Sequence, residues 1–297
     1  MKNLKDSDIR FNGIGVAHDL SPGQRDEIKK WVEQAKRDHV STSSDGAENY
    51  WFWVVGQGPR MRVIKILKNL SCLMLNARSL VNKIDLFQST VCNYNPNIIG
   101  VTETWCNSAI LDSKFYLKVY DLLRCDCKSQ NKEDGVLLYV KKVLKPIEFV
   151  TSSTFVDHIL CKVSNLLTGV CYQSSNYTIV GHDSNDSLNQ LIKDINDKHF
   201  LMMGDFNYPD INWLQLTVDD SASTDCKELF HCFNECFLTQ HVTEYTRGNA
   251  VLDLVFSREP ELVSNVKTVE NLGTSDHNMV SFSIHDEQNN FVTDSWV

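Results

Sequence analysis

From residue 69 onward, short apolar runs alternate with segments whose apolar residues recur at helical spacing. Residues 70–76 and 97–103 are the first two apolar runs, and the segment 78–94 between them has a repeat of three to four residues, which is typical of an amphipathic helix. The repeat consists of Leu80, Ile84, Phe87 and Val91. These three segments predict a strand–helix–strand unit.

The same pattern continues to residue 284, but a helix does not follow every strand. Two further helices are predicted over 188–195 and 224–237. The further strands are predicted over 135–140, 166–172, 200–204, 252–256 and 279–284. Because several strands follow one another without a helix, we expect mixed sheets. The predicted fold class is α/β, a two-layer β-sandwich of mixed sheets flanked by helices.

Residues 1–68 have a different pattern and predict a small separate module of unknown role. Ser21, Pro22 and Gln24 are typical of a capping box at a helix start. Four apolar residues then recur at helical spacing, which predicts a helix ending near Val40. They are Ile28, Trp31, Val32 and Ala35. A β-hairpin is predicted over 50–67, with its turn at 56–59. The main domain is expected over 69–288, with a tail over 289–297.

Composition and charge exclude several classes of protein. The chain of 297 residues is 42% hydrophobic and 23% charged, as in globular proteins. It has no apolar run near the ~20 residues of a membrane helix, and no apolar segment of the kind found in secretion signals follows Met1. We therefore expect no membrane association, ten reduced cysteines, and a location in the nucleus or cytoplasm.

The net charge of −9 is unevenly distributed. Residues 1–68 contain 12 basic and 9 acidic residues, whereas the remainder contains 17 basic and 29 acidic residues. An acidic body binds polyanions poorly unless its carboxylates surround a cation, so a phosphate-handling site here would need a divalent ion. Binding to DNA is expected to be weak and salt-sensitive.

Polar residues follow the predicted buried strands at the points where those strands end. Asn76 and Glu103 end two strands of one strand–helix–strand unit and should lie at the same sheet edge. Other apolar runs end in, or are interrupted by, further polar residues, which packing alone does not explain. These residues are Asp205, Asn207, Asp253, Asp276 and His277.

Three of these segments resemble the endonuclease/exonuclease/phosphatase superfamily, and most of all the endonuclease domain of LINE-type (non-LTR) retrotransposons. The pair Gly204-Asp205-Phe206-Asn207 and Ser275-Asp276-His277 resembles the superfamily motifs in order and spacing. The run Tyr208-Pro209-Asp210-Ile211-Asn212-Trp213 is similar to the retroelement branch. Further similar segments contain Asn76, Glu103 and Asp253, and the resemblance extends over roughly 70–285.

The resemblance implies a Mg²⁺-dependent nuclease, with Mn²⁺ as an alternative ion, that nicks DNA by metal-assisted water attack on a phosphodiester. The implied metal ligands are Glu103, Asn76 and Asp276. The implied catalytic residues are Asp205, which activates water, Asn207 and His277, which bind the phosphate, Asp253, which orients the histidine, and Tyr172, which touches the phosphate. No obligate protein partner is evident.

Two other functions remain open on the sequence alone. One is a phosphoesterase of the same superfamily that acts on a small phosphoester. The other is a catalytically weak or dead retroelement remnant, which the acidic body and altered loops favour. Residues 173–175, Glu133 and Tyr245 depart from the superfamily pattern in these loops.

A cluster of cysteine and histidine residues suggests a zinc site, but this interpretation is disfavoured because the cluster lacks a Cys-x-x-Cys pair. The cluster consists of Cys226, His231, Cys232, Cys236 and His241.

Overall fold

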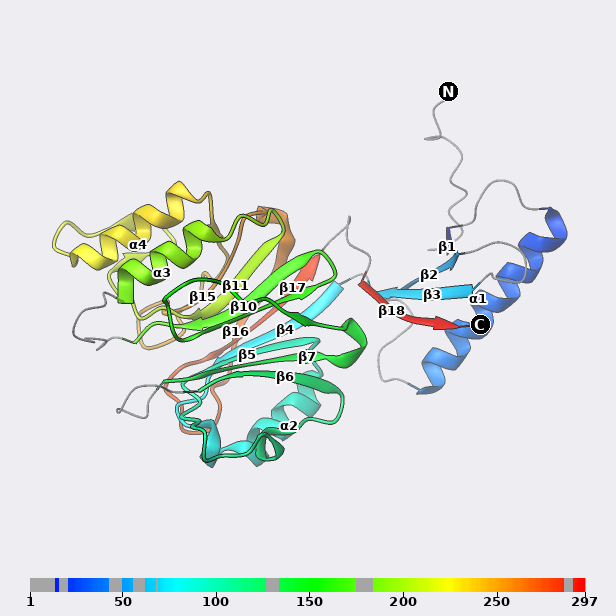
Figure 1. Ribbon diagram of the computed structural model, residues 1–297. Helices are drawn as coiled ribbons and strands as arrows, with labels where there is room; N and C mark the ends of the chain where they lie inside the picture. The colour runs from blue at the N-terminus through cyan, green and yellow to red at the C-terminus, as the bar shows by residue number, and fades with distance from the viewer. Residues whose placement is uncertain are drawn as a thin grey trace, which may run out of the picture. The chain divides into compact units, whose positions relative to one another are not determined.

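The computed structural model describes residues 14–15, 21–42, 50–55, 62–67, 69–126, 134–174, 184–285 and 291–296 (Figure 1). The chain divides into two compact units. One comprises Met1–Asn69 with Asp286–Val297, and the other comprises Leu70–His285. No helix in the described part of the chain is long and apolar enough to cross a membrane.

The larger unit is built on two six-stranded sheets. One sheet has the order β16 (Val263–Val269), β17 (Met279–His285), β4 (Asn69–Asn76), β5 (Ile98–Thr102), β7 (Val136–Lys141) and β6 (Tyr120–Cys125). The other has the order β14 (Thr239–Gln240), β15 (Asp253–Ser257), β11 (Phe200–Asp205), β10 (Leu166–Tyr172), β9 (His158–Val163) and β8 (Ile147–Glu148). Both sheets are mixed, since β4 pairs parallel with β5 and β10 parallel with β11, beside antiparallel neighbours. The predicted two-layer sandwich is confirmed.

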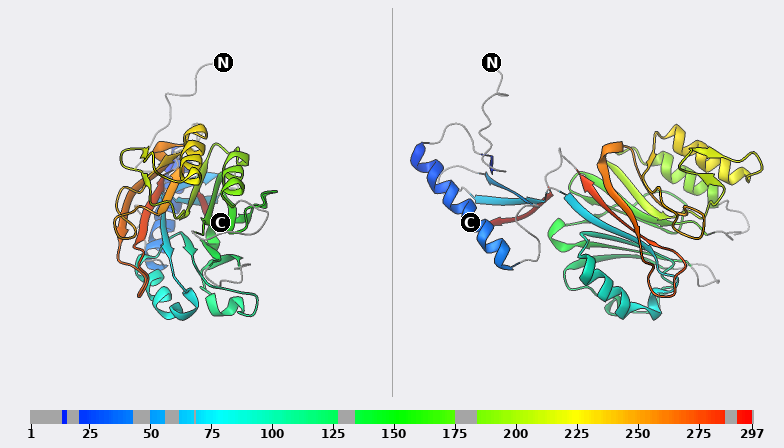
Figure 2. Two further views of the ribbon diagram at one scale, coloured as in Figure 1. Left: turned by 90° about the vertical axis from the view of Figure 1, so that its left-hand side faces the viewer. Right: turned by 180° about the vertical axis from the view of Figure 1, so that it is seen from behind.

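Helices cover the outer faces of the sandwich (Figures 1 and 2). Helix α2 (Ile84–Tyr94) lies on one side, while α3 (Ser184–Asp194) and α4 (Thr224–Glu235) pack together on the other. The short connections include a two-stranded pair, β12 (Ile211–Asn212) with β13 (Thr217–Val218). They also include 3-10 helices at Leu80–Asn82, Asp112–Phe115, Lys142–Leu144 and Pro260–Leu262.

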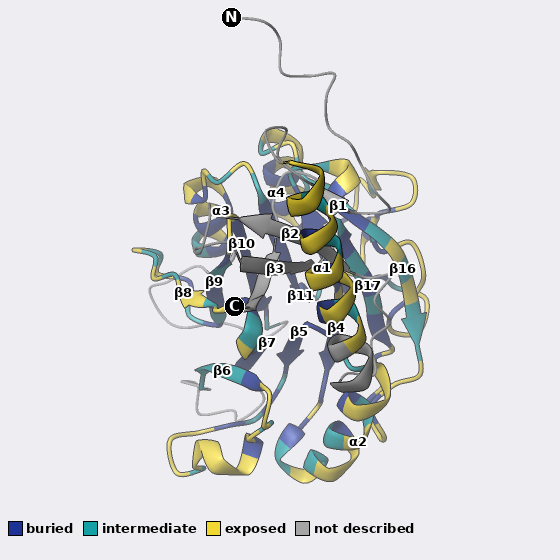
Figure 3. Cartoon of the chain, turned by 90° about the vertical axis from the view of Figure 1, so that its right-hand side faces the viewer, coloured by how far each residue is buried: buried dark blue, intermediate teal, exposed yellow. Residues whose placement is uncertain are grey.

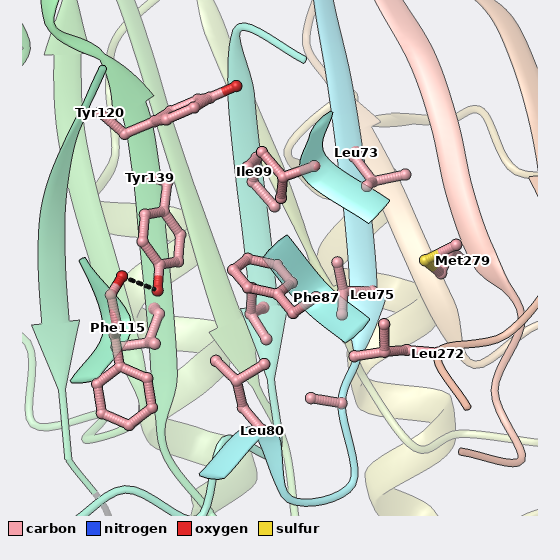
Figure 4. Packing of buried hydrophobic residues seen from close by; sticks show 14 of the residues in the cluster. Leu73, Leu75, Leu80, Phe87, Ile99, Phe115, Tyr120, Tyr139, Leu272 and Met279 are labelled. Carbon is pink, nitrogen blue, oxygen red and sulfur yellow. Dashed lines mark hydrogen bonds between the residues drawn. The ribbon is translucent and has the colours of Figure 1, made fainter. Parts of the chain in front are cut away.

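Successive side chains of each strand point to opposite faces of its sheet. Apolar residues at both sets of positions therefore give one face that packs against the helices and one that forms the sandwich interior. Ile99 of β5 and Phe87 of α2 join an outer cluster with Tyr139, whose ring lies 5.5 Å from that of Phe87 (Figure 4). The Tyr139 hydroxyl donates a hydrogen bond of 3.0 Å to the Phe115 carbonyl. On the inner face, a Cβ on Gly100 would lie 2.7 Å from Met203 Sδ of the facing sheet, so glycine permits the close approach of the sheets.

Burial follows the same layers. The central strands are buried, whereas exposed residues gather on loops and on the outward faces of helices (Figure 3). On the side of α4, the Phe233 ring packs 4.6 Å from that of Phe256 in β15. The core therefore continues from the sandwich interior through each sheet to its covering helix.

The larger unit differs from the sequence-based expectation in helix starts and in several strands. The helix predicted over 78–94 begins at Ile84, because Arg78 and Ser79 have left-handed backbone conformations with φ of 41° and 76°. Strands β6 and β16 were not predicted, since their partly exposed and polar residues weaken the apolar signal. The mostly buried strand β9 was not predicted either.

The smaller unit contains α1 (Pro22–Thr42) and a sheet with the order β1 (Ile14–Gly15), β2 (Tyr50–Val55), β3 (Arg62–Leu67) and β18 (Phe291–Trp296). The capping box is present: Ser21 and Gln24 each accept a hydrogen bond from the other's backbone N–H. Trp31, expected on the inner face of the helix, is 37% exposed. The predicted hairpin turn lies outside the described residues. The expected tail contains β18, which pairs antiparallel with β3.

Candidate active site

Strand register brings three of the predicted site residues into line across one sheet. Asp205, the last residue of β11, lies opposite Asp253 of antiparallel β15 and opposite Tyr172 of parallel β10. Both aspartates are fully buried. Because directly opposed residues place their side chains on the same face, the two carboxyl groups point into the sandwich together.

The facing sheet contributes Asn76 and Glu103. Asn76 ends β4 opposite Thr102 of parallel β5, so Glu103 follows at the same edge. Asn76 Nδ2 donates to Glu103 Oε1 at 2.8 Å and to Asp205 Oδ2 at 2.9 Å. One buried amide therefore joins carboxylates from the two sheets. The predicted convergence of these strand ends is present.

His277 lies against both aspartates. Its Nδ1 is 2.8 Å from Asp253 Oδ2 and 3.9 Å from Asp205 Oδ2, and the ring is buried. Burial disfavours the charged ring, but the hydrogen bond with Asp253 and the charges of Asp253, Asp205 and Glu103 outweigh it and raise the pKa of His277 to about 9. The imidazole is therefore protonated at neutral pH, with Asp253 fixing its orientation.

The two carboxyl groups joined by Asn76 have unfavourable surroundings for negative charge. Burial, and then the charge of Asp253, raises the pKa of Asp205 well above its ordinary value. Burial likewise raises the pKa of Glu103, although the Asn76 hydrogen bond opposes this. A cation bound here would stabilise the ionised forms.

A metal ion fits this donor set. One potential ligand atom from each of Glu103, Asp205 and His277 lies within 4.8 Å of the others. Because the His277 ring is protonated and both of its nitrogens then carry hydrogens, the remaining donors are carboxylate oxygens, which suit a hard divalent cation such as Mg²⁺. Asn76 Oδ1 accepts a hydrogen bond of 3.0 Å from the Arg78 N–H, so the amide oxygen faces away from Glu103 and Asp205, which contact the amide nitrogen.

Asn207 and Tyr172 lie beside this cluster. The Asn207 backbone N–H donates to Asp205 Oδ1 at 3.1 Å, and its side chain donates to the Gln173 carbonyl at 2.7 Å. Asn207 and Glu103 both have left-handed φ values, of 55° and 46°. Such conformations in non-glycine residues concentrate at functional sites. The Tyr172 hydroxyl is 3.5 Å from Glu103 Oε1.

Asp276 is held apart from the buried carboxylates. Its two oxygens contact Arg78 and Arg247, at 2.9 and 2.8 Å. Partial burial favours a higher pKa for Asp276, but a backbone hydrogen bond and the charges of Arg247 and Arg78 outweigh it and lower the pKa.

Sequence reasoning did not single out two residues that support the site. Ser275 Oγ donates to the Asn76 carbonyl at 2.8 Å and accepts the His277 N–H, so it ties the two segments together. Thr246 Oγ1 accepts the backbone N–H groups of Leu252 and Asp253. For Ser275, the available signal was its place directly before Asp276 and His277.

The residues weighed for zinc have other contacts. His241 Nε2 lies 2.8 Å from Ser257 Oγ, and His231 Nε2 lies 3.0 Å from Glu235. Cys232 Sγ donates to the Asn189 carbonyl.

A family model and several solved structures are similar to this chain. A family model described as "Endonuclease-reverse transcriptase" matches residues 166–281. The matched part contains Tyr172, Asp205, Asn207, Asp253, Asp276 and His277, whereas Asn76 and Glu103 precede it. No curated protein matches the chain significantly.

Solved structures match over most of the chain. The endonuclease domain of TRAS1, a telomere-specific non-LTR retrotransposon, matches with a TM-score of 0.55 and 11% identity, over 73% of this chain and 98% of that one. The AP endonuclease LMAP from Leishmania major has a TM-score of 0.59 and 12% identity, over 74% and 88%. The chain has the endonuclease/exonuclease/phosphatase fold. The 3′-5′ exonuclease NExo from Neisseria meningitidis shares this fold, with a TM-score of 0.56 and 13% identity over 73% and 100%.

The superfamily resemblance seen in the sequence is thereby confirmed. The solved structures that share the fold include endonucleases and an exonuclease.

Proposed function

We propose that this protein is a Mg²⁺-dependent endonuclease that nicks one strand of DNA by hydrolysis of a phosphodiester. The observation that carries the proposal is the double hydrogen bond of Asn76 to Glu103 and Asp205, with the His277–Asp253 pair directly beside it. In this proposal Asp205 is the base, His277 is the protonated imidazole and Glu103 is the cation-binding carboxylate, at the strand ends where the two sheets meet.

Each side chain has a part in the reaction. Asp205 orients the attacking water and accepts its proton, as its buried carboxylate is more basic than an ordinary aspartate. His277 donates hydrogen bonds to the phosphate as negative charge develops on its oxygens. Asp253 holds His277 in its protonated form. Asn207 and Tyr172 bind the phosphate from the same strand ends.

Glu103 is the residue that would hold the metal ion. Asn76 and Asp276 are the further ligands of the proposal, and each would have to turn towards the ion an oxygen that now contacts Arg78 or, for Asp276, also Arg247. A bound ion would supply Lewis-acid stabilisation of charge on the phosphate and the leaving oxygen. Its positive charge also makes the acidic body compatible with a polyanion. DNA is the proposed substrate because the solved structures with this fold include enzymes that act on DNA. One of them is the NExo variant described as bound to product DNA hairpin.

Nicking of supercoiled plasmid tests the proposal. Nicking is expected with Mg²⁺ and not with EDTA, and it should be lost in Asp205→Asn and His277→Gln. Matched controls make the same chemical changes at exposed sites, Asp220→Asn and His231→Gln, and should nick like the unsubstituted protein.

Absence of nicking by folded protein at low salt would contradict the proposal. Hydrolysis of a small phosphoester without any action on DNA would instead support the runner-up activity. Inactivity towards both would support a catalytically dead remnant.

A further inference from the structure

Two arginine side chains lie at the rim of the candidate active site and share one anion. Arg78 Nη1 contacts Asp276 Oδ1 at 2.9 Å, and Arg247 Nη2 contacts Asp276 Oδ2 at 2.8 Å. The side chains of Arg78 and Arg247 are 49% and 43% exposed. One carboxylate thus lies between two guanidinium groups that solvent, or a ligand, can reach.

The backbone of Arg78 is tied to the catalytic cluster. Its N–H donates to Asn76 Oδ1 at 3.0 Å, and its left-handed φ of 41° turns the chain at the end of β4. Lys83 Nζ donates to the carbonyls of Ala77 and Arg78, each at 2.7 Å. The backbone from which the Arg78 side chain extends is therefore held beside Asn76.

The backbone of Arg247 is held on the opposite side of Asp276. Arg247 and Ala250 exchange backbone hydrogen bonds of 3.1 and 2.9 Å across a tight turn. Asn278, next to His277, donates its N–H to the Thr246 carbonyl at 2.7 Å. Thr246 in turn accepts from the N–H of Asp253. This turn is therefore attached to both members of the His277–Asp253 pair.

A phosphodiester, like a carboxylate, presents two charged oxygens that two guanidinium groups can bind together. We propose that Arg78 and Arg247 bind one phosphate of the DNA backbone, next to the phosphate that is cleaved, and that Asp276 occupies this phosphate site in the free protein. The inference rests on the proposed function. When DNA binds, its phosphate replaces the Asp276 carboxylate between the two arginines.

The competing explanation is that the arginines only position Asp276. The two explanations differ in DNA affinity without metal. If the arginines bind phosphate, removing either one weakens binding, whereas removing the charge of Asp276 strengthens it. If they only position Asp276, none of these changes alters binding beyond the effect of one charge on the surface.

The experiment measures binding of a labelled DNA duplex to the full chain by fluorescence anisotropy, in EDTA, over a range of KCl concentrations. Arg78→Gln and Arg247→Gln are each expected to raise Kd about three- to tenfold. The double variant should reduce the slope of log Kd against log salt by about 1, the value of one phosphate. Asp276→Asn should lower Kd at least about threefold, while losing nicking activity.

Matched controls remove or add the same charge away from the site. Lys142 and Lys145 follow β7 beyond Val140, which pairs with Ile98 at the start of β5, so they lie at the opposite sheet edge from Glu103. Lys142→Gln, Lys145→Gln and Asp220→Asn should each change Kd less than twofold. Arg78→Lys keeps the charge without the guanidinium fork and should retain the salt slope with weaker binding.

The outcomes separate the inference from the proposed function. Nicking by the unsubstituted protein, with unchanged Kd in folded Arg78→Gln and Arg247→Gln, would overturn the inference alone. Weakening no greater than in the lysine controls would overturn it as well. A protein that neither binds nor nicks DNA would overturn the proposed function and the inference with it. Thermal unfolding of each variant verifies that it is folded.

Discussion

Gly204, directly before Asp205, is where one added methyl group should have its largest effect. It lies on β11, an inner strand of its sheet, and is paired with Cys171 of β10 on one side and with Leu254 of β15 on the other. A Cβ at Gly204 would lie 1.9 Å from the Cys171 carbonyl oxygen and 2.9 Å from its carbonyl carbon. These are backbone atoms, so no side-chain rotation can relieve the overlap.

The cost of Gly204→Ala follows from this geometry. Ordinary contact begins at 3.4 Å, so β10 and β11 would have to separate locally by about 1.5 Å. That separation stretches ladder hydrogen bonds worth about 1 kcal/mol each and adds an overpacking cost of about 1–3 kcal/mol. We expect Gly204→Ala to lower the free energy of unfolding by about 3 kcal/mol or more.

Gly100→Ala is the matched comparison. Its Cβ would meet Met203 Sδ at 2.7 Å, at the flexible part of a side chain, so a cost of about 1 kcal/mol is expected. Urea unfolding followed by tryptophan fluorescence and by circular dichroism measures both variants. Equal losses for the two, or a loss below about 1 kcal/mol for Gly204→Ala, would refute the reasoning from backbone overlap.

Three further changes test the structure around the site. Thr246→Val leaves two buried backbone N–H groups without their acceptor and should cost about 2–4 kcal/mol in urea unfolding, whereas Thr246→Ser should cost much less. Asp253→Asn should reduce plasmid nicking about 10²- to 10⁴-fold, because the buried histidine that it contacts loses its charge partner; nicking within tenfold of the unsubstituted protein would contradict that role. Burial lowers the pKa of His241 to about 4, below about 6.5 in the unfolded chain. The unfolded chain thus binds more protons, and stability should fall by about 1–2 kcal/mol between pH 6.5 and 4, allowing for solvent screening. His241→Gln should flatten the pH dependence of the free energy of unfolding. The same pH dependence in this variant as in the unsubstituted protein would contradict the assignment to His241.

Much of the fold could be predicted because its signals are local. The helical repeat ending at Tyr94 and the apolar run before Asn76 depend on residues close in sequence, and both elements are present. The helix start was misplaced because the left-handed turn at Arg78 and Ser79 is stabilised by distant groups: the Ser79 N–H donates to the Glu103 carbonyl. No local pattern records that contact.

The candidate site shows the same division. Its residue types could be identified from the sequence, since polar side chains at the ends of buried strands are costly unless they are paired or functional. That Asn76 and Glu103 would lie at one sheet edge could be predicted, whereas the contact of Asn76 with Asp205 of the other sheet could not. Asn76 and Asp205 are 129 positions apart, and their contact depends on how the two sheets pack.

The sequence by itself determined the alternation of strands and helices and the chemistry at the strand ends, because propensity and periodicity act over a few residues. Only the tertiary structure decided that Asn76 joins Glu103 to Asp205 and that Asp276 lies between Arg78 and Arg247. Strand register and sheet packing arise from contacts summed over the whole unit. A side chain's partner is therefore a property of the assembled fold.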